Sequence, residues 1–134
     1  MARRRDARRL AVQILYQAEV GRRRPAEVVD ERRQLGQRVP TFTEELVLGV
    51  AEHLPELDAL IGEYAQDWTV ERMAAVDRAI LRVACYEIRY REDVPVGAAI
   101  DEAVSAAREM STEGSGGFVN GILGRIARDA APSG

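Results

Sequence analysis

Arginine dominates the start of this chain. Five of the first nine residues are arginines: Arg3, Arg4, Arg5, Arg8 and Arg9. On a helix, which turns by about 100° per residue, Arg5, Arg9 and Tyr16 lie along one line, and two further arginines flank it. Guanidinium groups bind phosphate through paired hydrogen bonds, and a tyrosine ring is a platform on which an unpaired base can stack. This combination predicts a face for single-stranded RNA that ends at Tyr16.

Other interpretations of the arginine-rich face stay open. It could be solvated, with a half-buried tyrosine, or it could be an arm for anionic membranes or for DNA. A membrane anchor needs bulky apolar residues opposite its charges. The opposite face here is instead an alanine-rich stripe that suits helix packing: Ala7, Ala11, Ile14, Leu15 and Ala18. The arginines repel one another, and the helix dipole disfavours cations at the N-terminus. We therefore expect a polyanion to supply the compensating charge.

The charge is distributed unevenly along the 134 residues. All 19 basic residues are arginines, and residues 1–38 contain 11 of them against five acidic residues, a net charge of +6. The rest of the chain has eight arginines against 17 acidic residues, a net charge of −9. This asymmetry indicates two kinds of partner, one of them polyanionic.

Few residues offer catalytic or metal-binding chemistry. His53 is the only histidine, so neither a histidine-based metal cluster nor a serine triad can be assembled. Cys85, the single cysteine, is interpreted as a small core residue. Glu87 falls within an apolar helix face, where a carboxylate needs a partner, so we expect it to link two helices. We therefore expect no enzyme activity, no metal and no cofactor.

Apolar residues spaced by three or four predict helices throughout and no strand. The helices are expected at 3–20, 25–35, from about 41, 55–66, 70–90, 96–110 and about 115–129. Thr41 and Glu44 are predicted to form a capping box, and Thr69 to cap the fifth helix. That helix is expected to be central, and Trp68 is expected to plug the connection before it. Because there is one cysteine and no apolar span of 18 residues, a cytoplasmic protein is expected, with no membrane association.

Three stretches of the chain resemble the NusB family of transcription antitermination proteins. They are RRRDARRLAVQILYQAEV, VDRAILRVACYEIRYREDVP and AIDEAVSAAREMSTEGSGGFVNGIL. The likeness runs in order from Arg3 to about Ile126, nearly the whole chain. It implies an all-α fold, a NusB-like helical bundle. It also implies one RNA-binding domain over 1–134, with packed subdomains at about 1–53 and 54–130.

The resemblance also implies a function and partners. Such a protein binds the boxA element of nascent rRNA transcripts together with NusE, a small-subunit ribosomal protein, and helps RNA polymerase to read through terminators in rRNA operons. Some proteins of this kind pair, and a homodimer through the first helix would hide the RNA face. A purely protein-binding adaptor is therefore the second hypothesis.

Site residues carried over by position lie in three regions. On the RNA side they agree with the face above: Arg4, Arg5, Arg8 and Tyr16. Phe118 and Asn120 are expected near the RNA, and Asp77 and Tyr86 near the protein partner; much of Phe118 is expected in the core. The chain departs from the family pattern at Gly114, where an acid is common, and at Gly117, where lysine often occurs.

Overall fold

A computed structural model describes residues 2–66 and 68–129, and within these ranges the chain is almost entirely helical. The elements are α1 (Ala2–Gly21), α2 (Pro25–Gln34), α3 (Thr41–Glu52), α4 (Leu54–Tyr64), the 3-10 helix η1 (Val70–Arg72), α5 (Ala75–Tyr90), α6 (Val96–Met110) and α7 (Ser115–Asp129). No strand occurs among the residues described. The expected all-α class is confirmed.

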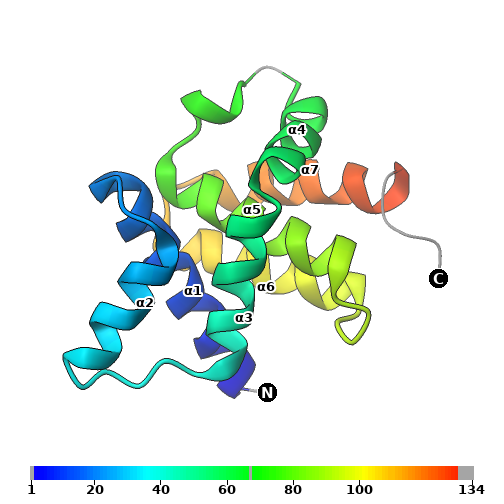
Figure 1. The fold of residues 1–134 in the computed structure, drawn as a ribbon. Coiled ribbons are helices and arrows are strands. Elements are labelled where there is room, and N and C mark those ends of the chain that lie inside the picture. The colour runs from blue at the N-terminus through cyan, green and yellow to red at the C-terminus, as the bar shows by residue number, and fades with distance from the viewer. Residues whose placement is uncertain (1, 67, 130–134) are drawn as a thin grey trace.

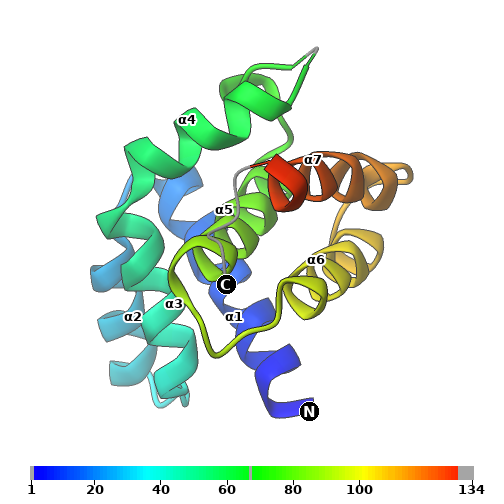
Figure 2. The same ribbon diagram turned by 90° about the vertical axis from the view of Figure 1, so that its right-hand side faces the viewer.

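Helix α5 lies at the centre of the molecule. It packs against α1, α3, α4, α6 and α7, and the expectation of a central fifth helix is confirmed. Helices α1, α2 and α3 pack together, and α6 and α7 form the most extensive helix pair. Figures 1 and 2 show α1 running between the α2–α3 pair and α6. Helix α4 lies at the end of the molecule away from the N-terminus. The division near residue 53 stays a prediction.

Proline and glycine set several helix ends where they were expected. Pro25 is the first residue of α2, where its missing N–H costs no hydrogen bond. Gly36 follows that helix with a φ of +90°, a backbone conformation that favours glycine. Helix α1 ends at Gly21, but the left-handed residue there is Arg22, with a φ of +54°.

Two predicted caps are wrong. Pro40 occupies the cap position of α3, so Thr41 is already helical, and no side chain caps the helix. Glu44 pairs instead with Arg33 at 3.0 Å. Thr69 makes no capping hydrogen bond either, and it precedes the short η1 helix and not α5.

The fifth helix starts later than predicted, at Ala75, because Met73 and Ala74 are extended. The Arg78 guanidinium donates hydrogen bonds to the carbonyl oxygens of Val70 (2.9 Å) and Met73 (2.8 Å), which holds this segment out of the helix. Trp68 does not plug the connection, since it is 52% exposed.

The core is built from aliphatic side chains on all the helices. The predicted inner stripe of α1 is buried throughout: Ala7, Ala11, Ile14, Leu15 and Ala18. Cys85 is also buried, as predicted, and burial raises the pKa of its thiol to about 12. None of the helices described has both the length and the apolar composition that crossing a membrane requires.

Candidate nucleic-acid interface

The arginines of α1 differ in how far they reach into solvent. The side chains of Arg4 and Arg5 are 44% and 47% exposed, and Arg3 is exposed at the start of the helix. Arg8 and Arg9 are only 13% and 19% exposed. The expectation of an open row is therefore correct for the first turn and wrong for Arg8 and Arg9, which lean onto α5 and α6.

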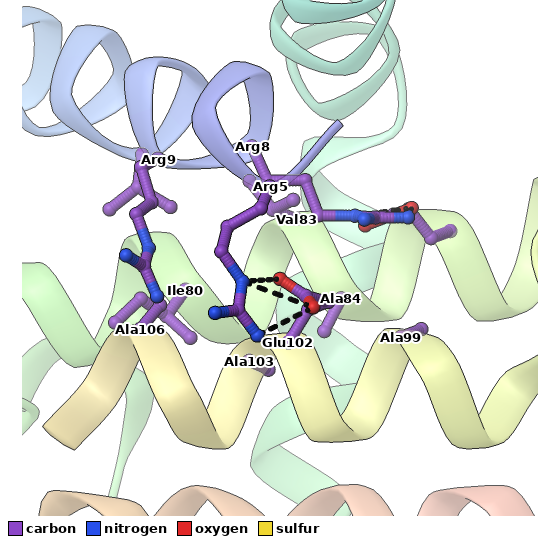
Figure 3. A pocket seen from close by; sticks show the side chains of 12 residues that line it. Arg5, Arg8, Arg9, Ile80, Val83, Ala84, Ala99, Glu102, Ala103 and Ala106 are labelled. Carbon is purple, nitrogen blue, oxygen red and sulfur yellow. Dashed lines mark hydrogen bonds and ion pairs between the residues drawn. The ribbon is translucent and has the colours of Figure 1, made fainter. Parts of the chain in front are cut away.

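Acidic residues from the second half of the chain neutralise this row. Arg4 pairs with Asp93 at 2.9 Å. Arg5 donates from Nε and Nη2 to the Glu102 carboxylate, each at 3.1 Å, as Figure 3 shows. The Glu102 pKa is lowered by this hydrogen bond from Arg5.

Arg9 is also paired with a carboxylate of α6. It donates to the Glu109 carboxylate and, at 3.1 Å, to the Ser105 hydroxyl. The prediction that a polyanion must supply the compensating charge is therefore wrong, because the protein's own carboxylates supply it.

Arg8 is bound to a buried carboxylate. Its guanidinium donates two parallel hydrogen bonds to Glu87, from Nε at 2.9 Å and from Nη2 at 2.9 Å. The Glu87 side chain is 1% exposed. Glu87 thus links α5 to α1, as predicted. It occupies the Nε and Nη2 donors of the Arg8 guanidinium.

Phe42 of α3 supports the same arginines, and sequence reasoning missed it. The guanidinium carbon of Arg4 lies 4.3 Å from the centre of the Phe42 ring, and those of Arg91 and Arg8 lie at 5.1 and 5.4 Å. Cations over an aromatic face are attracted by its quadrupole. No spacing in the sequence signals this contact, because it joins three distant segments.

The cleft under the arginines is too small for a base. It lies between α1, α5 and α6 and has a volume of about 20 Å³. Arg5, Arg9 and Glu102 form its rim, and alanines of α6 lie below them (Figure 3). A cavity of this size accommodates about one water molecule, so a nucleic-acid ligand would lie across the rim.

Tyr16 lies beside a larger apolar groove. The residue is 41% exposed, and the groove, of about 520 Å³, continues along Val20, Val76 and Met110. Val12, which shares the helical line of Arg5 and Arg9, is buried at the edge of this groove and does not belong to the open face. The exposed part of the ring is thus accessible to a flat ligand.

Phe118 and Asn120 lie on α7, and Phe118 lines a third groove. Phe118 is half-buried, and Asn120 is exposed. Trp68, Asp77 and Phe118 line this groove together with residues 112–115. Val76 and Met110 line the Tyr16 groove, and Asp77 and Thr112 line this one, so α5 and the end of α6 contribute to both. The two grooves share no lining residue.

Asp77 and Tyr86 are not brought together. Asp77 is buried towards α7, where the Ser115 hydroxyl donates a hydrogen bond to its Oδ2 at 3.1 Å. Tyr86 faces α3, where it lies against Gly49 and His53. Nine positions separate the two residues on α5, which places them on opposite sides of the helix. A partner that contacts both residues would have to span both sides of α5, and the assignment of Asp77 and Tyr86 to a partner surface stays a prediction.

Comparisons with known proteins agree on one family. The NusB family model matches residues 5–128. The transcription antitermination protein NusB of Geobacillus kaustophilus is 45% identical over 124 residues, which are 92% of this chain and 95% of that protein.

Solved structures show the same fold. T. maritima NusB superposes with a TM-score of 0.86 at 36% identity, over 96% of this chain and 93% of that one. The fold is also similar to a structure of the antitermination factors NusB and NusE in complex with dsRNA. There the TM-score is 0.84 at 24% identity, over 96% and 98% of the two chains.

Proposed function

Since this chain belongs to the NusB family, we propose that it is a transcription antitermination factor that binds the boxA element of nascent rRNA transcripts together with NusE. In this role it acts in the cytoplasm, as part of the RNA polymerase antitermination complex, and promotes read-through in rRNA operons. It does so by binding and requires no catalytic site.

One observation carries the proposal: half-exposed arginines and an exposed tyrosine share α1, and the tyrosine lines an apolar groove. Arg4 and Arg5 would bind successive phosphates, and Tyr16 would stack on an unpaired base. Arg3 and Arg9 extend the same track. Arg8 contributes chiefly by anchoring α1, because Glu87 occupies its guanidinium.

The groove beside α7 is the proposed continuation of the RNA site. Phe118 offers a half-buried ring and Asn120 an exposed amide. NusE is proposed to bind next to them, on the Asp77 side of α5. The similarity of the fold to that of NusB in a complex with NusE and dsRNA supports these two kinds of partner.

Substitution of Tyr16 tests the proposal. In fluorescence anisotropy with a short boxA-like RNA, with and without NusE, Tyr16→Ala should weaken binding by about 1–3 kcal/mol, since one stacked base is lost. Tyr90→Ala is the matched control, because Tyr90 is a similarly exposed tyrosine at the far end of α5.

Two results would contradict the proposal. The first is equal affinity for the boxA-like RNA and a scrambled RNA, which would indicate a general basic adaptor. The second is a homodimer in sedimentation that persists when RNA is added in excess, because burial of α1 between two copies would leave no RNA face.

A further inference from the structure

The arginine face of α1 is not a basic patch in the folded protein. Each of four arginines is matched by one carboxylate: Arg4 by Asp93, Arg5 by Glu102, Arg8 by Glu87 and Arg9 by Glu109. The eight groups sum to no net charge. A phosphate that approaches this face meets a paired guanidinium, and the carboxylate competes with it for the same donors.

Two of these pairs are able to open. Glu109 is 56% exposed, and Glu102 is 21% exposed with a partner, Arg5, that is 47% exposed, so water reaches both pairs. Glu87 is buried and holds the helices together, and Asp93 is also bound by Arg91 at 2.9 Å. Among the four carboxylates, Glu102 and Glu109 are thus the two that are neither buried nor bound by an arginine outside α1 in the described residues.

We propose that Glu102 and Glu109 compete with RNA: they occupy Arg5 and Arg9 in the free protein and weaken any binding that depends on phosphates alone, so that tight binding also requires base contacts. The inference rests on the proposed RNA-binding function and deepens it. Non-specific binding to nucleic acid comes almost entirely from phosphate contacts. Because the carboxylates weaken the phosphate contacts, an RNA that binds tightly must also place a base against Tyr16 or in the neighbouring groove.

Glu102 acts as a permanent competitor and not as a pH switch. The Glu102 pKa lies below its usual range because of the hydrogen bond from Arg5. The carboxylate therefore stays ionised throughout the neutral range, and RNA must displace it at the cost of one exposed ion pair.

The test is an equilibrium titration of Glu102→Gln, Glu109→Gln and the double variant with boxA-like and scrambled RNA at several salt concentrations. Each substitution should raise the affinity for both RNAs about two- to fivefold, since an exposed pair no longer has to be broken. The slope of log affinity against log salt should steepen by up to about 0.7 per phosphate contact. We expect the wild-type protein to bind scrambled RNA weakly and each variant to bind it measurably more tightly.

Asp101→Asn is the matched control. Asp101 is exposed on α6 next to Glu102, it forms no ion pair within the described part of the chain, and its substitution changes the net charge by the same amount. It should alter affinity far less than Glu102→Gln does. In an Arg5→Gln background, Glu102→Gln should have no more effect than Asp101→Asn, because the donor that Glu102 occupies is gone.

Failure of this inference can be told from failure of the proposed function. If Arg5→Gln weakens RNA binding but Glu102→Gln behaves like Asp101→Asn, the carboxylates do not compete with RNA and the inference is wrong. A loss of affinity in Glu102→Gln would also overturn it, since Glu102 would then position Arg5 for phosphate. If Arg5→Gln leaves RNA binding unchanged, the RNA face itself is misplaced and the proposed function fails with it.

Discussion

Glu87 illustrates how much the type and position of one residue can reveal. A carboxylate within an apolar helix face needs a partner, and that requirement alone predicted a link between helices. The partner, Arg8, lies 79 positions away, and its identity could not be read from the sequence. Phe42 is the opposite case, because an aromatic residue at the start of a helix carries no signal that it will lie under three arginines.

Substitution of Glu87 should be far more damaging than substitution of Glu109. Glu87→Gln leaves Arg8, which is largely buried, without its counter-charge, and we expect a loss of about 3 kcal/mol in the free energy of unfolding. Glu109→Gln removes an exposed pair and should change stability by less than about 1 kcal/mol. Urea unfolding at pH 7 measures both. Equal losses would mean that the buried pair contributes no more than the surface one.

Cys85 should be chemically inert in the native protein. Burial raises its thiol pKa to about 12, so the reactive thiolate is scarcely populated at neutral pH. A thiol reagent at pH 8 should label it only at the rate at which the protein opens, and fully in denaturant. Rapid labelling of the folded protein would place Cys85 outside the core.

At the scale of helices, prediction succeeded where proline, glycine or a clear apolar stripe marks an element. The bounds of α6 and the start of α7 are as expected. It failed between Val70 and Ala74, where two buried residues three positions apart, Val70 and Met73, fit a helix and a 3-10 turn equally well. The hydrogen bonds from Arg78 decide between the two, and they are a tertiary effect.

The contact between α3 and α5 depends on one glycine. A Cβ atom at Gly49 would lie 2.2 Å from the Tyr86 ring, so Gly49→Ala forces that ring or the helices to move. We expect a loss of about 1–3 kcal/mol, typical of overpacking. Gly97→Ala is the control, because nothing lies within 4 Å of the added atom, and it should leave stability unchanged or slightly raised. Thermal unfolding compares them, and additional replacement of Tyr86 by leucine should recover part of the loss.

For the whole molecule, the uneven charge of the sequence has an internal explanation. It was interpreted as a sign of two partners, yet the basic start of the chain folds against acidic residues of its second half. The arginine-rich face could be predicted from the spacing of its residues, because that spacing is local. Its neutralisation could not, because the pairs join residues up to 100 positions apart.

Acid should therefore destabilise this protein. Hydrogen bonds from arginines lower the pKa values of Glu102, Asp93 and Glu31 in the folded state. A lowered pKa contributes stability that is fully present above the pKa of the unfolded chain and is lost as the pH falls through the folded value. The free energy of unfolding should be nearly constant from about pH 8 to 6 and should fall below about pH 5. A stability that stays constant down to about pH 3 would show that these pairs contribute nothing.

The distance along the chain between Arg9 and Glu109 also matters during synthesis. At about 5–20 residues per second, the ribosome synthesises α1 several seconds before it reaches Glu109, the last of the carboxylates that pair with this helix. During that interval the nascent helix is strongly cationic and lies beside ribosomal RNA. A product truncated before α6 would lack Glu102 and Glu109 and would leave Arg5 and Arg9 without these partners, so we expect such a fragment to bind scrambled RNA more tightly than the finished protein does.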